Sequence, residues 1–376
     1  MKACAQITGW GKCVPPKIVS NEDLARRVDT SDEWIRSRTG IAARRIAEPR
    51  DTTASLAIRA ARQALAVAGV APNKVDLIIV ATATPEHLFP ATACLVQDAL
   101  GATHAGAFDL SAGCSGFVYA LNLAAQAIES GRQRYVLVIG SETLSRVVNW
   151  QDRNTCVLFG DGAGAVLLQA CQGDGGILST VLGADGSGAE LLIIPAGGSK
   201  RPASAETVQN GEHCIHMDGR EVYRFATRIL ARATREAIAA AGITLDKVAL
   251  LIPHQANQRI IESAAKELGL PRERVYANLQ RYGNTSAASI PIALCEAIEE
   301  GRLHPGDHVV LAGFGAGLTW GATALRGGPP RITPPAQRWR RALNAVGYGL
   351  SAVRSVLARI WRRLDALVSG PRNGAR

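Results

Sequence analysis

The amino-acid sequence predicts an α/β protein made of two similar halves, each a mixed sheet covered on both faces by helices. Helical and strand patterns alternate along residues 1–327. The predicted strands are continuous apolar runs, which are typical of strands buried on both faces of a mainly parallel sheet. A unit of about 170 residues is also repeated, and such repeats usually pack face to face as one pseudo-symmetric body.

The elements of the first half follow in order. The alanine-rich segment 54–68 is amphipathic and predicts a helix, and VDLIIVAT at 75–82 predicts a buried strand. A second helix is expected over 117–129, and a second strand over YVLVIG at 135–140. Strands that alternate with helices in this way indicate crossover connections within one sheet.

The second half repeats this pattern at a constant offset. AGVAPNKVDLIIV at 68–80 aligns with AGITLDKVALLIP at 241–253, and YVLVIG at 135–140 aligns with HVVLAG at 308–313, each 173 residues later. Two matched segments at one offset make chance similarity a poor explanation.

Composition breaks divide the chain. Residues 185–215 are rich in Gly, Ser and Pro and predict a long surface loop, and the Gly-Gly-Pro-Pro run at 327–330 begins a linker. We therefore expect an N-terminal repeat over 1–171, a C-terminal repeat over 172–327, a linker over 328–335 and a tail over 336–376.

Charge is concentrated in the tail. The chain carries +10, but residues 331–376 hold ten arginines and one acidic residue, Asp365, so the body is close to neutral. The basic character therefore does not predict nucleic-acid binding by the body. The eight cysteines form no C-x-x-C pair, and no secretory signal or long apolar run is visible. Reduced thiols in a cytoplasmic protein are the expectation.

Cys114 is the candidate nucleophile. It lies in DLSAGCSGFVYAL, where a strand-like segment ends and an apolar helical segment begins. A thiol at a helix N-terminus faces unpaired N–H groups and the positive end of the helix dipole, which lower its pKa. Gly113 and Gly116 allow a substrate to approach closely. The alternative, a buried structural cysteine, suits the other seven.

His254 and Asn284 are the candidate polar partners. His254 follows the repeated strand in IPHQANQRII, and Asn284 lies in the turn RYGNTSAAS. Ligands bind at strand ends in α/β folds, although a lone His is more often structural and a lone Asn is more often a turn residue. Together they supply a nucleophile with two donors for a developing oxyanion.

The chain resembles the β-ketoacyl-acyl-carrier-protein synthase III family. The resemblance rests on VDTSDEWIRSRTGI, AGCSGF, FGDGAGA, PHQAN, GNTSAAS and FGAGLTWG, which occur in the family order across residues 1–326. It implies a thiolase-like fold, and a reaction in which an acyl-CoA acylates Cys114 before malonyl-acyl-carrier-protein is decarboxylated and condensed with it in the initiation of fatty acid synthesis.

The resemblance also implies roles for individual residues. His254 and Asn284 would donate to the malonyl thioester as it becomes an enolate, and Phe314 would wall the decarboxylating group. The backbone N–H groups of Cys114 and Ala316 would hold the other oxyanion, although the family often has Gly at the position of Ala316. No permanently bound cofactor and no metal are implied; acyl-CoA and malonyl-acyl-carrier-protein are the substrates.

Binding residues follow from the same resemblance. Trp34, Arg38 and Arg153 match positions that hold the adenine and phosphates of CoA. Asn257, placed with these CoA-binding residues, matches the family Asn that supports the catalytic site. Basic residues that match positions at the tunnel mouth, where an acidic carrier protein would dock, are Arg224, Arg259 and Lys266. Phe89 matches a residue that reaches the acyl pocket of a partner subunit and implies a homodimer. For the basic positions, an ordinary solvated charged face is the alternative.

The sequence disfavours two further motifs as binding sites and three other functions. Gly160–Gly164 (GDGAG) precedes strand-like AVLLQ rather than a helix, which disfavours a dinucleotide site. His213, Cys214 and His216 lack a second ligand pair for a metal. A related synthase or acyltransferase of secondary metabolism, of polyketide or quinolone type, is the main alternative, and the retained Asn284 favours condensation. The repeat disfavours a Cys-His-Asn hydrolase, and the intact trio disfavours an inactive membrane-tethered scaffold.

The tail predicts a basic amphipathic helix over 336–369. Its apolar residues recur with alternating spacings of four and three, from Trp339 to Leu367, and arginines occupy the other faces. A helix of this kind can lie on a membrane surface, pair with a partner helix or dock on the enzyme itself. The family resemblance ends before this segment.

Overall fold

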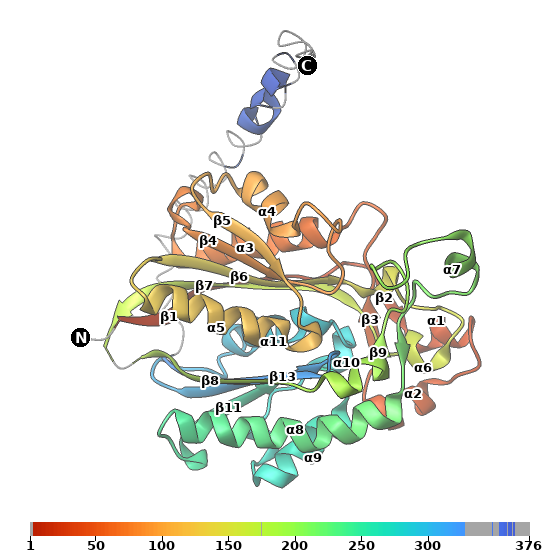
Figure 1. Ribbon diagram of the computed structural model, residues 1–376. Coiled ribbons are helices and arrows are strands. Elements are labelled where there is room, and N and C mark those ends of the chain that lie inside the picture. The colour runs from red at the N-terminus through yellow and green to blue at the C-terminus, as the bar shows by residue number, and fades with distance from the viewer. Residues whose placement is uncertain are drawn as a thin grey trace.

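The structure is a computed structural model that describes residues 3–173, 175–327 and, further along, 348, 353–358, 360–362 and 364. The described body has five layers (Figure 1), with two sheets separated by a pair of central helices and covered outside by further helices. The predicted α/β class with two similar, helix-covered halves is confirmed. The other tail residues of the helix predicted over 336–369 lie outside the described residues.

The first sheet has five strands in the order β1-β7-β6-β4-β5. Its strands are β1 (Ala3–Cys13), β4 (Leu77–Ala81), β5 (Gly106–Leu110), β6 (Tyr135–Thr143) and β7 (Asp161–Gln172). β4 pairs in parallel with both β5 and β6, whereas β7 pairs antiparallel with both β6 and β1. The predicted mixed sheet is confirmed. It is less parallel than the apolar strand runs indicate, because β6 and β7 follow each other in the chain as antiparallel neighbours.

The second sheet has four strands in the order β11-β12-β13-β8. Its strands are β8 (Gly176–Ala184), β11 (Val248–Pro253), β12 (His308–Gly315) and β13 (Thr319–Arg326). Only β11 and β12 are parallel. The offset of 173 residues carries the start of β6 to the start of β12, and the start of α5 (Gly116–Glu129) to that of α11 (Ser289–Glu299).

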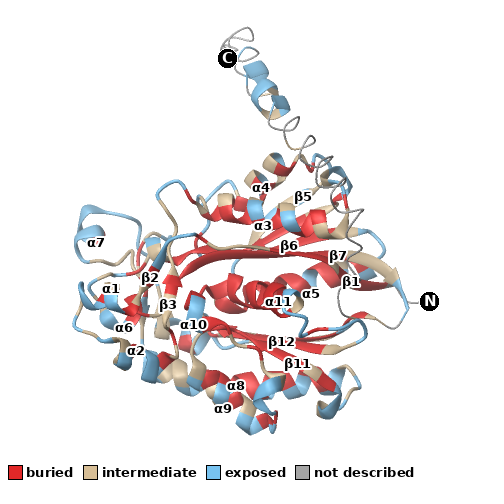
Figure 2. Cartoon of the chain, turned by 180° about the vertical axis from the view of Figure 1, so that it is seen from behind, coloured by how far each residue is buried: buried red, intermediate tan, exposed pale blue. Residues whose placement is uncertain are grey.

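The central helices α5 and α11 are buried between the sheets, as the red ribbons of Figure 2 show. Their side chains join strand residues of both sheets in one apolar cluster that includes Phe117, Ile79, Ile290 and Leu311. α3 (Thr53–Ala68) and α4 (Thr92–Leu100) cover the outer face of the first sheet, and α8 (Gly219–Ala240) and α9 (Gln258–Leu268) that of the second.

Local sequence explains where the outer helices begin and end. The α3 helix opens with a capping box between Thr52 and Ser55, and it ends at Gly69, whose left-handed backbone (φ 66°) suits glycine. The α8 helix begins at Asp218, whose carboxylate accepts hydrogen bonds from the backbone N–H groups of Arg220 and Glu221.

Short elements cap one end of the sheets. They include α1 (Asn21–Ala25), α2 (Asp32–Thr39), α6 (Arg153–Cys156), α10 (Leu279–Tyr282) and the β2 (Ile18–Ser20) and β3 (Ala43–Arg45) pair. The predicted loop at 185–215 contains a 3₁₀ turn η4 (Gly186–Leu191), β9 (Leu192–Ile193) and α7 (Ala205–Gln209), and β9 pairs with β10 (His216–Met217). No described helix combines the length and apolar character needed to cross a membrane.

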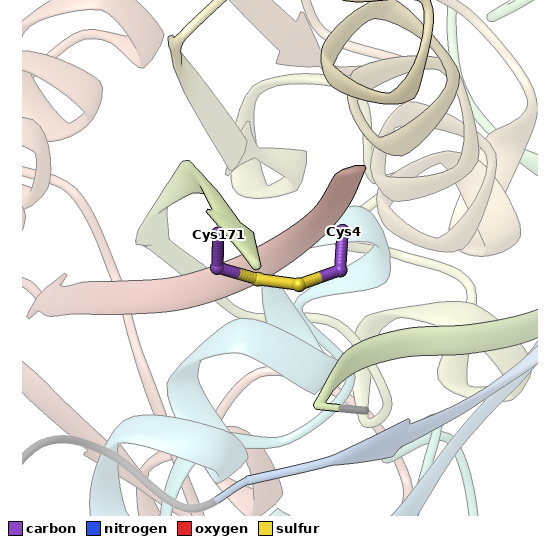
Figure 3. Close-up of a disulfide and its surroundings, with 2 residues drawn as sticks. All are labelled: Cys4 and Cys171. Carbon is purple, nitrogen blue, oxygen red and sulfur yellow. A yellow bond between two sulfur atoms is a disulfide. The ribbon is translucent and has the colours of Figure 1, made fainter. Parts of the chain in front are cut away.

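Cys4 and Cys171 form a disulfide between β1 and β7 (Figure 3), where the two residues are directly opposed and their Cα atoms lie 5.0 Å apart. The expectation that all eight cysteines are reduced is therefore wrong for this pair. The sequence offered no C-x-x-C signal, because the two cysteines are separated by 167 residues and meet only when β1 pairs with β7.

We predict that the Cys4→Ser variant unfolds at a lower denaturant concentration than the parent protein. A cross-link over this chain length restricts the unfolded state by at most about 5 kcal/mol in the chain-entropy account. Urea unfolding with and without a reductant measures the effect, with Cys94→Ser, an exposed free cysteine, as the control. A midpoint that neither the variant nor the reductant lowers would contradict the prediction.

Candidate active site

Cys114 lies in a tight turn at the start of a central helix. The 3₁₀ turn η2 (Gly113–Ser115) joins β5 to α5, and Gly113 adopts a left-handed backbone (φ 51°). A side chain at Gly113 would come within 2.9 Å of the Ala316 nitrogen, and one at Gly315 within 2.5 Å of the Cys114 nitrogen. The glycines therefore let the backbone of the β12–β13 turn approach the nucleophile closely.

The Cys114 side chain is buried, and burial raises the pKa of its thiol to about 12, against a hydrogen bond from the Ser286 side chain that lowers it. The pKa is raised and not lowered as expected for a cysteine at a helix N-terminus, because burial desolvates the thiolate. Burial therefore favours the neutral thiol of Cys114 when no substrate is bound.

His254 directly follows β11 and is 1% exposed. Its backbone N–H donates to the Ala312 carbonyl at 2.7 Å, and its Nδ1 atom lies 2.6 Å from the Ser289 hydroxyl. The Phe314 ring meets the imidazole edge-on, with 5.3 Å between ring centroids. Burial lowers the pKa of His254 to about 3. The imidazole is therefore neutral and held in one orientation.

Asn284 is held by backbone hydrogen bonds to the segment that directly precedes β7. Its N–H donates to the Leu158 carbonyl at 2.8 Å, and its own carbonyl accepts from Gly160 at 2.9 Å. Its side-chain Oδ1 accepts from the Ser286 N–H at 2.8 Å. Because Oδ1 is engaged in this way, the amide NH₂ group is the part of the side chain that can donate to a ligand.

The turns that carry Cys114 and follow Asn284 pack against each other, and two serines connect them to the Cys114 thiol and to His254. The turn η2 packs against η7 (Ser286–Ala288), which follows Asn284 and is the counterpart of η2 at the offset of 173 residues. Ser286 adopts a left-handed backbone (φ 48°), as Gly113 does in the first copy. Its side chain connects η7 to the Cys114 thiol, and Ser289 in α11 connects the same region to His254.

Sequence reasoning missed Glu142, Ser286 and Ser289. The Glu142 carboxylate is fully buried and accepts hydrogen bonds from the Thr84 hydroxyl at 2.6 Å and from the Ala83 N–H at 3.1 Å. Burial raises its pKa. Through these hydrogen bonds, Glu142 connects the turn after β4 to the end of β6. A carboxylate after the apolar strand YVLVIG was the available signal, since an acidic residue there must be paired or neutralised.

The predicted CoA residues also lie together. The guanidinium carbons of Arg38 and Arg153 lie 4.8 Å and 5.2 Å from the centroid of the Trp34 ring. The Asn257 amide donates to the Arg38 carbonyl at 3.0 Å and caps α9. An indole face with two exposed guanidinium groups can stack on a purine and neutralise phosphates.

The predicted carrier-protein residues are exposed on neighbouring helices. Arg224 lies on α8 and pairs with Glu221 at 2.7 Å, whereas Arg259 on α9 stacks on Tyr223, 5.4 Å from the ring centroid. Lys266, further along α9, lines a separate groove of about 1110 Å³ with Gln258, Tyr276 and Arg281. Arg224 and Arg259 therefore lie close together on the α8–α9 pair, whereas Lys266 lines the groove and is not part of this pair of arginines.

Phe89 is 87% exposed beside the equally exposed Leu88, on the segment between β4 and α4. Two adjacent apolar side chains of this size are seldom left in water without a partner surface. Among the described residues, no cluster of His, Cys, Asp and Glu is arranged to hold a metal ion.

We predict that Ser289→Ala slows the step that needs His254 by about tenfold, the equivalent of one hydrogen bond. The Ser289 hydroxyl accepts from the Gln255 N–H at 3.4 Å, so it can donate its own hydrogen to Nδ1 and keep the single N–H of the neutral imidazole on Nε2. ¹⁵N NMR of the imidazole nitrogens reports the tautomer. An unchanged tautomer together with an unchanged rate would contradict this role.

Comparison with known proteins gives consistent matches. Family profiles described as 3-oxoacyl-[acyl-carrier-protein] synthase III match residues 108–186, and the C-terminal domain of that description matches residues 238–327. The chain is 58% identical over 322 residues to "Beta-ketoacyl-[acyl-carrier-protein] synthase III" of Symbiobacterium thermophilum, covering 86% of this chain and 98% of the relative.

Solved structures agree with the sequence matches. The chain superposes with a TM-score of 0.79 at 49% identity on 3-oxoacyl-[acyl-carrier-protein] synthase III from Aquifex aeolicus, covering 86% of this chain and 99% of that one. A priming β-ketosynthase of the R1128 polyketide pathway gives a TM-score of 0.81 at 38% identity, covering 88% and 98%.

Proposed function

Since this chain belongs to the β-ketoacyl-[acyl-carrier-protein] synthase III family, we propose that it joins an acyl-CoA primer to malonyl-acyl-carrier-protein through Cys114, His254 and Asn284. The chain is an acyl-transferring condensing enzyme of the initiation step of fatty acid synthesis. The observation that carries the assignment of residues is that η7 and the start of α11 connect all three: Ser286 contacts both the Cys114 thiol and the Asn284 amide oxygen, and Ser289 contacts the buried, neutral His254 imidazole.

In the first half-reaction the Cys114 sulfur attacks the thioester carbon of acyl-CoA. The carbonyl oxygen becomes an oxyanion, and the backbone N–H groups of Cys114 and Ala316 donate to it. Collapse of this intermediate breaks the bond to the CoA sulfur, which leaves as a thiol with the proton that Cys114 gives up. Because burial favours the neutral thiol, proton removal accompanies substrate binding and attack.

In the second half-reaction malonyl-acyl-carrier-protein enters the emptied site. Loss of carbon dioxide leaves negative charge on the thioester oxygen, and the Nε2–H of His254 and the NH₂ group of Asn284 donate to it. A fixed donor in a site without water stabilises such charge strongly, because it does not reorganise during the reaction. The enolate carbon then attacks the acyl-enzyme, forming the new carbon–carbon bond and expelling the Cys114 thiolate, which regains a proton.

Exposed residues outside the catalytic pocket would bind the CoA and carrier-protein parts of the two substrates. We propose that the Trp34, Arg38 and Arg153 cluster takes the nucleotide end of CoA, with Asn257 holding the Arg38 backbone. Arg224 and Arg259 attract the acidic carrier protein, with Lys266 as a more distant contributor. The exposure of Phe89 supports a homodimer in which each subunit covers this ring of the other, and neither substrate is a permanently bound cofactor.

The two halves keep their predicted limits in this proposal, with the nucleophile in residues 1–171 and both donors in 172–327. The tail at 336–376 lies outside the region that the family profiles match, so we assign it no step of the reaction. We propose instead that it binds a partner outside the catalytic body.

A panel of acyl-CoA primers with malonyl-acyl-carrier-protein tests the proposal. We expect a β-ketoacyl-acyl-carrier-protein product and one carbon dioxide per product, measured by mass spectrometry of the carrier protein. Free fatty acid without carbon dioxide release would instead indicate a hydrolase, and transfer to another acceptor without decarboxylation would indicate a non-condensing acyltransferase. A primer preference confined to unusual acyl groups would favour the alternative of secondary metabolism. The priming β-ketosynthase of the R1128 polyketide pathway, which this chain resembles, is an enzyme of that kind.

A further inference from the structure

The described part of the C-terminal tail is a helix with an exposed apolar face. Its six large apolar side chains are between 47% and 72% exposed, and they are Val353, Val356, Leu357, Ile360, Trp361 and Leu364. At 100° per residue these positions fall on one face of the helix. Figures 1 and 2 show this helix standing clear of the two sheets, beyond α4, with its surface exposed.

Contacts with the body lie on the other face of the helix. The Ser355 hydroxyl donates to the Asp98 carboxylate of α4 at 2.6 Å, and Ser355 lies almost opposite the centre of the apolar face in the helical projection. Earlier in the tail, Tyr348 packs against the apolar cluster under α3, with the Arg62 guanidinium 4.5 Å from its ring centroid. These contacts turn the apolar face away from the enzyme, which argues against docking of that face on the catalytic body.

The chemistry of the remaining surface identifies the partner. Arg354 is exposed at the edge of the apolar face, and Arg362 is exposed on the opposite side of the helix. Residues 331–376 hold ten arginines against one acidic residue. An apolar stripe on an arginine-rich helix, with a Trp among its residues, is suited to the boundary between lipid headgroups and acyl chains, where it binds anionic lipids most strongly. A partner helix would have to supply both an apolar seam and matching acidic flanks.

The location of the helix separates it from the condensing reaction. The family profile match ends at residue 327, and the Symbiobacterium thermophilum relative is covered to 98% of its length by 322 residues of this chain. We propose that the helix around residues 353–364 docks this enzyme on an anionic phospholipid surface, with Val353, Leu357, Ile360 and Trp361 entering the headgroup boundary. This proposal does not depend on the reaction assigned to Cys114.

Co-sedimentation of the full-length protein with vesicles tests the proposal. We expect binding to vesicles of equal parts phosphatidylglycerol and phosphatidylcholine at low salt, and much weaker binding to phosphatidylcholine alone. Raising the salt should weaken binding, because screening shortens the reach of the arginines. The double variant Leu357→Asn with Ile360→Asn should bind at least about 10-fold more weakly, since two buried aliphatic side chains are lost. Condensing activity in solution should be unchanged.

The matched control is Ala358→Asn, which places the same residue type on the same helix outside the apolar face and should bind like the parent. Absence of binding to the anionic vesicles at low salt would overturn the proposal. Equal binding by the parent and the double variant would overturn it too. Self-association without lipid that the double variant abolishes would instead show that the apolar face pairs with a second helix.

Discussion

The Cys114→Ala variant is expected to keep its fold and to form no acyl-enzyme. The substitution removes one sulfur atom from a buried position and leaves the hydrogen-bonded turns around it intact. No other described group takes over as the nucleophile, so condensation should fall by at least about 10⁴-fold, as for other nucleophile deletions. Intact-protein mass spectrometry after incubation with an acyl-CoA measures the adduct directly.

A second buried cysteine supplies the control for this experiment. Cys156 is free and 1% exposed, and it lies in α6 beside the capping elements rather than in η2. The Cys156→Ala variant should acylate like the parent protein, which separates loss of a nucleophile from loss of a buried thiol. Normal labelling of Cys114→Ala would show that the acyl group resides elsewhere.

His254→Ala and Asn284→Ala are expected to separate the two half-reactions. Both variants should still form the acyl-enzyme at Cys114, because their proposed donors act on the enolate of the second stage. Decarboxylation of malonyl-acyl-carrier-protein should fall by about 10²–10³ for each missing donor. Release of labelled carbon dioxide is the measurement, and undiminished release from either variant would refute the assignment. His213→Ala, in the surface loop, is the matched control.

The pH dependence follows from the neutral imidazole. Burial lowers the pKa of His254 to about 3, so His254 stays a neutral donor throughout the range from pH 5 to 8 and should cause no inflection in the decarboxylation rate there. The unfolded state has an ordinary histidine, with a pKa of about 6.5. As pH falls from that value towards 3, protons bind the unfolded state preferentially, and His254 increasingly destabilises the fold.

The sequence by itself determined the class of fold, and it supplied the residues that we propose carry the chemistry. Cys114 and His254 stand where an apolar strand pattern ends, and the 173-residue repeat predicted two halves of the same design. Such patterns are local, because periodicity and turn residues depend on neighbours along the chain. For this reason the helix predicted over 117–129 begins within one residue of the α5 helix, Gly116–Glu129.

Only the tertiary structure decided the burial, the hydrogen-bond partners and the pKa values of those residues. The raised pKa of Cys114 reverses the expectation drawn from its helix N-terminus, because desolvation depends on every atom packed around the thiol rather than on its own helix. Ser289 beside His254 and Glu142 beside Thr84 come from distant segments, and the disulfide joins strands whose pairing no local pattern encodes. The outward direction of the tail's apolar face was likewise open in the sequence. Side-chain orientation and burial are properties of contacts between segments, and those contacts exist only after the two halves have packed.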